Sequence, residues 1–467
     1  MSKKIIIKKI KSTKKNDEYI YPTELIQTYN VEIYFSLPPN SKNWVHDTQF
    51  DDVMNDDTMR RTKQIRALKK IISPEQRTKE WYEQRDGMMT ASLIPTALGL
   101  NEYEKQYRAI IHKLIEIPFT GKKTCFWGKK FEPVATAIYQ YRMNVIVELY
   151  GCIPHDCKFI GASPDGIISE YKLDGIHKTN LVGRMLEVKC VVTRKINMTS
   201  NNIHEIIPEH YYPQPQIQMQ CCKLDDCDFW QCNIKEYNSR EDFINDTNAK
   251  EPFRSKTTGF EKGVLIQLLP ISVINGKTDS ELDEIRYDHA QWIYPPRIDM
   301  TPHDCDIWVS QTCSNYQKSP EWKNYMIDKV IYWKLHESRC VTTKRDDKWF
   351  KAQLPILEKI WNYVKFFRHN KEMKELFLKY VKYAETTFNE DIMNDKIMTV
   401  AEVLSDTSNK KYNRDVKKIK KELIDDEERR DSNEVIMDNK QFTQKCSTSK
   451  SKKSNAVFDF NQVLIDI

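Results

Sequence analysis

Residues 163–166 read SPDG, and residues 185–190 read MLEVKC. The first stretch is a turn between two short runs of strand-forming residues, and the second is a strand that mixes apolar residues with charge. Because side chains alternate along a strand, Glu187 and Lys189 project from the same face. The turn can present the carboxylate of Asp165 beside that strand. Together the two stretches predict a polar site at one edge of a sheet.

Two carboxylates that meet at one place favour a divalent cation. Asp165 and Glu187 would repel each other unless a cation lay between them, and oxygen ligands of this kind suit Mg²⁺ or Mn²⁺. Lys189 beside the metal could orient or deprotonate a water molecule, because desolvation and a nearby cation lower the pKa of an ammonium group. The same residues can also be an ordinary turn and a surface Glu–Lys ion pair. The pattern alone leaves both interpretations open.

The segments around these stretches predict a mixed α/β fold. Hydrophobic spacing indicates helices before and after them, and alternation indicates short strands between. The expected helices are residues 77–85, a helix capped by Thr90 or Ser92, and residues 105–117, 127–143 and 213–224; the expected strands are residues 145–150, 158–162, 166–169, 184–191 and 228–237. This order is typical of a central mixed sheet flanked by helices.

The chain divides into three parts by composition. Residues 1–74 are expected to be a basic, partly flexible extension with one strand at 31–37. Residues 75–385 are expected to fold as one domain. Residues 386–467 carry blocks of charge with few apolar anchors, so we expect a disordered tail with one transient helix around 415–429.

Within the folded part, residues 240–325 are irregular and give no clear pattern. Residues 330–335 and 340–343 can be late strands. Apolar residues at helical spacing from Leu354 to Phe367 predict a long amphipathic helix near the edge of the domain.

The totals limit the class of protein. The 467 residues are 40% hydrophobic, which excludes a wholly disordered chain. No apolar run is long enough for a membrane helix and the start lacks a secretory apolar segment, so a soluble, intracellular protein is expected. The net charge of +6 is modest, and charge alone does not indicate a nucleic-acid partner. The twelve cysteines include no CxxC pair, so buried free thiols are expected, with a zinc or iron–sulfur site as a minor alternative.

Five blocks of sequence suggest a family. In chain order they are residues 81–92, 127–133, 163–166, 186–190 and 207–219. In this order they resemble the PD-(D/E)xK nuclease superfamily and, within it, the YqaJ viral recombinase and phage lambda exonuclease family. The resemblance implies a restriction-endonuclease-like PD-(D/E)xK core, and residues 240–325 diverge from the family.

The resemblance assigns the metal chemistry to particular residues. Asp165 and Glu187 would be metal ligands, together with the backbone carbonyl of Val188, and Lys189 would activate the attacking water. Glu132 would bind or orient a second metal; the alternative is an acid on a helix surface. The implied cofactor is Mg²⁺, or Mn²⁺, with two ions in each active site. A metal pair suits phosphodiester hydrolysis because charge develops on both the attacking and the leaving oxygens.

Three further residues take roles from the resemblance. Gln214 would support Lys189, although Pro213 and Pro215 flank it and fit a helix only if the helix begins there. Arg85 and Ser92 would bind the terminal 5′-phosphate of the strand being degraded, since a guanidinium suits phosphate bidentately.

The alternative for these last two residues is structural. Arg85 would then be a helix arginine paired with Glu83 or Asp86, and Ser92 would only cap a helix.

The expected function is that of a metal-dependent DNA nuclease, a phosphodiester hydrolase. The resemblance implies a 5′→3′ exonuclease on double-stranded DNA ends that leaves 3′ single strands for viral recombination or genome processing. Contacts to phosphates carry no base information, so little sequence specificity is expected. The alternatives are an endonuclease or structure-specific nuclease on the same core, or a non-catalytic DNA-binding recombination scaffold.

The resemblance also implies partners. Double-stranded DNA ends, a single-strand annealing protein and two further copies of the chain in a trimer are expected, and no membrane. If the protein is viral, it would act in the host cytoplasm or at a viral replication site.

Overall fold

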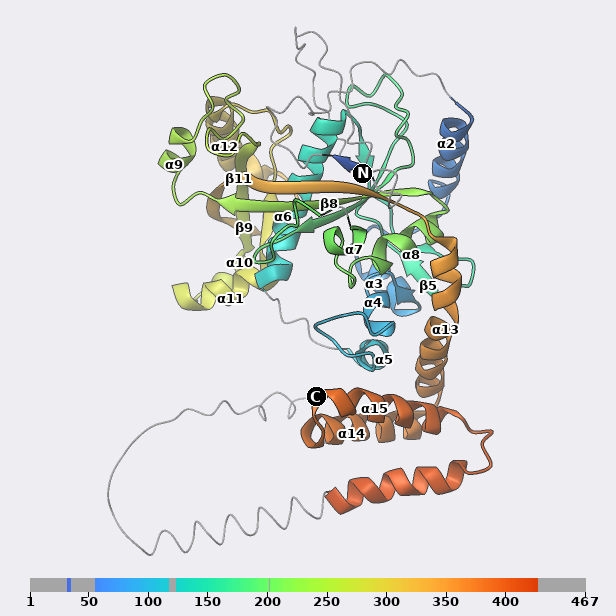
Figure 1. The fold of residues 1–467 in the computed structure, drawn as a ribbon. Helices are drawn as coiled ribbons and strands as arrows, with labels where there is room; N and C mark the ends of the chain where they lie inside the picture. Colours follow the sequence, from blue (N-terminus) through green and yellow to red (C-terminus); the bar gives the residue numbers. More distant parts are fainter. Residues whose placement is uncertain (1–31, 35–54, 117–122, 201, 427–467) are drawn as a thin grey trace, which may run out of the picture. The chain divides into compact units, whose positions relative to one another are not determined.

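The computed structural model describes residues 32–34, 55–116, 123–200 and 202–426 (Figure 1). The chain divides into two compact units, of which the first ends at Val364 and the second begins at Lys365. The predicted strand at 31–37 is described only as β1 (Glu32–Tyr34), which pairs with a strand late in the chain.

An eight-stranded mixed sheet is the centre of the first unit. Seven of its strands lie in the order β10-β9-β11-β8-β7-β6-β3, and β1 pairs with β11. The strands of this sheet not yet bounded are β3 (Val147–Glu148), β6 (Gly166–Ile168), β7 (Met185–Cys190), β8 (Asp226–Glu236), β9 (Lys262–Pro270), β10 (Gln291–Ile293) and β11 (Tyr325–Lys344). The β6–β7 pair is antiparallel and the β7–β8 pair is parallel, which confirms the predicted mixed α/β sheet.

A second, smaller sheet and the helices complete the first unit. The small sheet has the order β2 (Met89–Thr90), β5 (Ile160–Ala162) and β4 (Ile153–Pro154). The helices are α2 (Asp56–Leu68), α3 (Lys79–Asp86), α4 (Ile94–Ala97), α5 (Arg108–Leu114), α6 (Lys123–Met143), α7 (Ile203–Ile206), α8 (Pro213–Cys222), α9 (Arg240–Asn245), α10 (Ile271–Ile274), α11 (Asp279–His289) and α12 (Pro302–Asn315), and α13 (Asp347–His369) runs past Val364. The cap prediction was wrong, because Thr90 lies in β2 and α4 begins after Leu93 without a side-chain cap.

The core forms where α6 packs on the sheet (Figure 1). Phe131, Ala135 and Ile138 are fully buried at helical spacing, and they meet Leu186 of β7 and Trp230 of β8. The Trp230 indole donates a hydrogen bond to the Ala135 carbonyl at 3.1 Å. Burial of this apolar stripe determines which side of α6 faces the sheet and β7.

The stretch at 240–325 is ordered and supplies part of the sheet, which corrects the expectation of irregular structure. Its strand β9 is almost wholly buried and pairs with β10 and β11. The two expected late strands are one strand, β11, which pairs with β8 along most of its length. Two register shifts interrupt the alternation of side chains along β11, one between Ile327 and Lys329 and one between Leu335 and Glu337. The sequence pattern therefore predicts short separate strands where the structure has one long strand.

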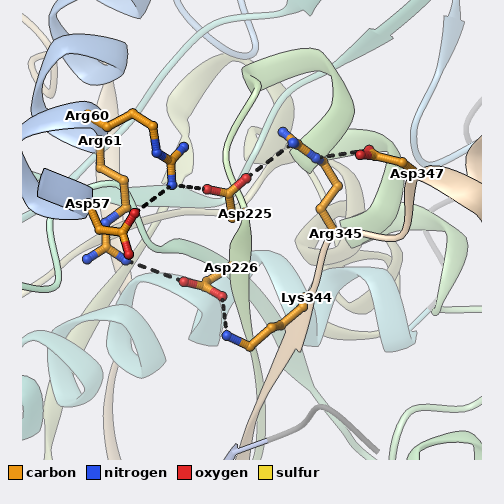
Figure 2. A pocket seen from close by; sticks show the side chains of 8 residues that line it. All are labelled: Asp57, Arg60, Arg61, Asp225, Asp226, Lys344, Arg345 and Asp347. Carbon is orange, nitrogen blue, oxygen red and sulfur yellow. Dashed lines mark hydrogen bonds and ion pairs between the residues drawn. The ribbon is translucent and has the colours of Figure 1, made fainter.

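Helix α2 shows that part of the predicted N-terminal extension is folded onto the domain. Its Arg61 donates to the Asn180 carbonyl at 3.0 Å, and its Arg66 lies 2.6 Å from Glu170. A cavity of about 270 Å³ lies beside α2, and Figure 2 shows the ion pairs between the side chains that line it. Eight charged side chains line the cavity, namely Asp57, Arg60, Arg61, Asp225, Asp226, Lys344, Arg345 and Asp347. The lining has equal numbers of acidic and basic side chains, so the cavity does not present one sign of charge. The ion pairs between these side chains connect α2 to the start of β8 and the end of β11.

The second unit is helical. It contains α14 (Lys371–Thr387), α15 (Glu390–Ser405) and a further helix over residues 412–426. Ile397, Ala401 and Leu404 of α15 are fully buried, and Tyr383 of α14 donates to Glu422 at 3.1 Å. A disordered tail from residue 386 was therefore the wrong expectation up to residue 426, because the apolar spacing of α15 outweighs its charge. The expected helix at 415–429 is present as far as residue 426.

Two further features of the described residues concern membrane helices and cysteines. No helix of the described part of the chain is long and apolar enough to cross a membrane. The eleven cysteines within the described residues are free thiols, and most of them are buried.

Candidate active site

The turn before β6 places Asp165 against β7. Gly166 pairs with Leu186 across the antiparallel β6–β7 ladder, so Asp165 lies beside the middle of β7. The Val188 amide donates a hydrogen bond to Asp165 Oδ2 at 2.8 Å. At Gly166 an added Cβ would lie 2.1 Å from Val147 Cγ1, so only glycine permits this close approach of β6 to β3.

Glu187 is the buried centre of the site. Its side chain is 0% exposed and forms an ion pair with Lys189, whose side chain is 20% exposed. The second oxygen of Glu187, Oε2, accepts a hydrogen bond from Gln218 Nε2 at 2.6 Å. Both oxygens of a fully buried carboxylate therefore have donors, which is what a buried charge requires.

Helix α8 supplies two glutamines to this centre. It begins at Pro213, and both Pro213 and Pro215 lie in the first turn, where backbone amides have no acceptor within the helix. Lys189 Nζ donates to Gln214 Oε1 at 3.1 Å, so the predicted contact is present despite the prolines. Gln218 lies one turn further on the same face.

The third glutamine of the motif, Gln216, faces away from the site. Its amide nitrogen donates to the Lys344 carbonyl at 3.0 Å, and its amide oxygen accepts from the Asp346 amide at 2.8 Å. Gln218 was missed by sequence reasoning, although its spacing of four residues from Gln214 was a usable signal.

Glu132 lies on α6 near the other acids. The guanidinium of Arg77 is 3.5 Å from its carboxylate. Burial raises the pKa of Glu132, Arg77 opposes this shift, and the neighbouring Glu187 raises the pKa further. Glu132 is therefore close enough to sense the charge of Glu187, and Arg77 is a further neighbour that the sequence did not reveal.

The three acids concentrate negative charge at one place. Burial raises the pKa of Asp165 well above its usual range, and the carboxylates of Glu187 and Glu132 add to this rise. Burial alone would lower the pKa of Lys189, but Glu187 and Asp165 outweigh it and raise the pKa above the ordinary value. Without a metal the lysine is thus a cation that offsets part of the negative charge of the acids; the lowered pKa expected beside a bound metal stays a prediction.

The donor set fits a hard divalent cation. The carboxylates before β6, in β7 and in α6 lie close enough to affect one another's pKa, and carboxylate oxygens are the ligands that Mg²⁺ and Mn²⁺ prefer. Within the described residues, however, no three Asp, Glu, His or Cys side chains stand arranged as a metal site. Lys189 and Gln218 each donate to one oxygen of Glu187, and these contacts fix the orientation of the carboxylate.

Arg85 and Ser92 form a second group. The Arg85 guanidinium stacks 4.1 Å from the centroid of the Trp81 ring, one turn earlier on α3. It donates to the hydroxyls of Ser92 and Ser163, at 3.3 Å in each case, and the Trp81 indole also donates to Ser163 at 3.0 Å. Because Ser163 belongs to the same turn as Asp165, this group adjoins the acidic centre.

Burial lowers the pKa of Arg85 from its ordinary value, as expected for a guanidinium packed on an indole and held by neutral hydroxyls. Sequence reasoning missed Ser163 and Trp81, although Ser163 stands in the quoted turn and Trp81 precedes Arg85 by one helical turn.

We expect Gln218→Met to lower the activity of the acidic centre by roughly 10- to 100-fold, because it removes the donor that fixes Glu187. The loss of a partner for a buried oxygen should also cost about 1–3 kcal/mol of unfolding free energy. The rate of DNA cleavage with Mg²⁺ measures the effect on activity. Chemical denaturation in EDTA measures the effect on the free energy of unfolding. Gln220→Met is the matched control, since Gln220 binds Asp347 at the exposed end of the same helix. Equal rates for the two variants would contradict the role of Gln218.

Parts of this chain are similar to known proteins. Residues 80–225 match the family model of the YqaJ-like viral recombinase domain. The chain is 38% identical over 326 residues to the uncharacterized protein R354 of Acanthamoeba polyphaga mimivirus, an alignment that covers 69% of this chain and 58% of the relative. The chain thus spans less than two thirds of that relative.

Two solved structures of an alkaline exonuclease, LHK-Exo, are also similar. One is the Laribacter hongkongensis enzyme and the other is LHK-Exo in complex with dAMP. Each is 24% identical, with 33% of this chain and 74% of the other chain covered and a TM-score of 0.25. The family match includes Arg85, Asp165 and Gln218 and extends almost to the start of β8. Residues 80–225 of this chain therefore resemble a YqaJ-like viral recombinase domain.

Proposed function

We propose that this protein is a metal-dependent deoxyribonuclease that degrades double-stranded DNA from its 5′ ends. The observation that carries the proposal is the meeting of Asp165 with Glu187 and Lys189 on the β6–β7 pair, inside the matched recombinase domain. The names of the similar alkaline exonuclease structures support a nuclease. Removal of the 5′ strand would leave 3′ single strands for viral recombination or genome processing.

The acids would hold the metal and the lysine would act on water. Asp165, Glu187, the carbonyl of Val188 and Glu132 would be the ligands of Mg²⁺ or Mn²⁺, with two ions in the site. When bound, the metal supplies charge stabilisation at the attacking and leaving oxygens. Lys189 would orient the attacking water and, with its pKa lowered by a bound metal so that it is a neutral amine, would accept the proton of that water. Gln214 keeps the Lys189 side chain in place at 3.1 Å.

The Arg85 group would select the DNA end. A terminal 5′-phosphate carries more negative charge than an internal phosphodiester, so it is the group that a half-buried guanidinium flanked by two hydroxyls would bind best. Arg85 and Ser92 are the proposed phosphate ligands, with Ser163 as a third donor. Because Ser163 lies two residues before Asp165, a phosphate held here would place the strand beside the acidic centre.

The test compares DNA ends. We expect a linear duplex with 5′-phosphates to be degraded with Mg²⁺ roughly 10- to 100-fold faster than the same duplex with 5′-hydroxyls, the value of hydrogen bonds to a charged group. Arg85→Lys keeps the charge but loses the planar pair of donors, so it should reduce this preference. Closed circular DNA should stay intact, and EDTA should stop the reaction.

The control for this substitution is Arg108→Lys, because Arg108 also lies over an aromatic ring, that of Tyr107. It should leave the end preference unchanged. Equal rates on the two kinds of end would count against the Arg85 pocket. Degradation of closed circles would favour the endonuclease instead, and a metal-loaded protein without any cleavage would favour a DNA-binding scaffold.

The wider assembly follows from the same proposal. The nuclease would be the domain proposed at residues 75–385, and DNA ends, a single-strand annealing protein and a homotrimer would be its partners. The host cytoplasm or a viral replication site would be its place of action.

A further inference from the structure

Three aromatic rings run from the surface to Lys189. Tyr103 is 74% exposed, and its ring centroid lies 5.7 Å from that of His210 in an edge-to-face contact. The His210 ring lies 4.1 Å from the ring of Tyr211. Lys189 Nζ lies 5.0 Å from the centroid of Tyr211. We call Tyr103, His210 and Tyr211 the aromatic row.

His210 is the buried member of the row. It is 7% exposed, and neither buried ring nitrogen has a hydrogen-bond partner. The nearest acid is Glu102, whose carboxylate lies 3.4 Å from Nδ1 and is itself 67% exposed. Burial lowers the pKa of His210 from its ordinary value, although Glu102 opposes this shift. The imidazole ring lies between the rings of Tyr103 and Tyr211, so it continues the row of stacked side chains.

A cation accompanies the row. Arg194 follows β7 in the chain, and its guanidinium lies 5.6 Å from the Tyr211 centroid. Arg194 Nη2 donates to Gln231 Oε1 of β8 at 2.7 Å, which fixes the group. Aromatic rings beside a fixed guanidinium are the combination with which proteins bind single-stranded nucleic acid, through base stacking and phosphate contacts.

The row is held rigidly at both ends. Tyr211 packs on the fully buried Phe229 at 6.0 Å. At the surface, the backbone amide of Tyr103 donates to Asn101 Oδ1 at 3.0 Å, and Asn101 in turn donates to Thr96 at 2.8 Å. The loop between α4 and α5 is therefore fixed, while the ring it carries stays exposed. An exposed aromatic side chain on a fixed backbone loses little entropy when a base stacks on it.

We propose that the aromatic row, with Arg194, binds the unpaired bases of a DNA strand next to the catalytic centre. This inference rests on the proposed nuclease function and adds a substrate contact to it: Tyr103 stacks on a base that has left the duplex. The row begins at the surface and ends at Lys189, so a strand that follows it would leave the duplex before it reaches the acidic centre.

The test uses a duplex with a short unpaired 5′ end that carries 2-aminopurine, in EDTA so that no cleavage occurs. Binding of the whole protein should quench the fluorescence as the base stacks. Tyr103→Phe should keep the affinity and the quenching. Tyr103→Ala should weaken binding by roughly 5- to 100-fold, the range for loss of one stacked base, and should reduce the quenching.

Tyr171→Ala is the control, since Tyr171 is 40% exposed and lies outside the row. It should bind as the unchanged protein does, and all three variants should keep the same Tm. Equal affinity and quenching for Tyr103→Ala and the unchanged protein would overturn the inference. This outcome is separate from failure of the proposed function, which would appear as a lack of cleavage by the unchanged protein with Mg²⁺.

Discussion

Asp165→Asn should remove the nuclease activity while leaving the fold intact. An amide has the size of the carboxylate and still offers an oxygen to the Val188 amide, which now donates to Asp165 Oδ2 at 2.8 Å. What it lacks is the negative charge that would hold a divalent cation. Loss of an outer-shell partner alone costs metal sites about 10- to 100-fold in activity or affinity, so loss of a ligand should cost at least about a hundredfold. Release of labelled nucleotides from a linear duplex with Mg²⁺ measures the effect.

The chain offers a matched control at Asp174. This residue also precedes a glycine in a turn, and its carboxylate accepts from the amides of Ile176 and His177 at 2.9 and 3.0 Å. Asp174→Asn changes the same chemical group in the same kind of turn, away from Glu187 and Lys189. It should keep the rate of the unchanged protein. Similar rates for Asp165→Asn and Asp174→Asn would show that the turn aspartate before β6 has no part in the reaction.

The elements that carry this site could be predicted because their signals are local. Strand β7 alternates around Glu187 and Lys189, and the glycine after Asp165 is required by the contact with Val147. The prolines around Gln214 predict a helix start, and α8 begins at Pro213. Each of these signals lies within a few residues of the side chain it places.

The parts that were missed depend on distant packing. Strand β9 is buried along almost its whole length, so it has no alternation that would separate it from an irregular apolar run. Gln216 and Gln218 are both buried glutamines of α8, yet only Gln218 reaches Glu187, because the choice depends on which side of α8 packs on the sheet. Helix α15 was predicted to be part of a disordered tail because its charges are visible in the sequence. Its packing against α14 is not visible there.

The electrostatics of the centre add a second role for Lys189. The sequence suggests an ammonium group weakened by a bound metal, and without a metal the carboxylates around it raise its pKa. Without a metal, the lysine neutralises Glu187 and keeps the acids together. The same residue would therefore stabilise the empty site and act on water in the loaded one, and these two roles can be separated by substitution.

Lys189→Met should impair both stability and activity. It leaves Glu187 buried with Gln218 as its donor and without its cation. Removing one partner of a buried ion pair costs about 3–5 kcal/mol of unfolding free energy, which denaturation in EDTA measures. Loss of a positioned proton-transfer group should also lower the cleavage rate with Mg²⁺ by roughly 10²- to 10⁴-fold.

The double variant Glu187→Gln with Lys189→Met separates the two effects. A neutral amide at position 187 needs no cation, so most of the lost stability should return, since replacing both partners of a buried pair is often close to neutral. Activity should not return, because both a proposed metal ligand and the group that acts on water are gone. Restored cleavage in the double variant would contradict a catalytic role for Lys189. An unchanged stability of Lys189→Met would instead show that the Glu187–Lys189 pair does not hold the acids together, because an unpaired buried carboxylate at Glu187 must lower the free energy of unfolding.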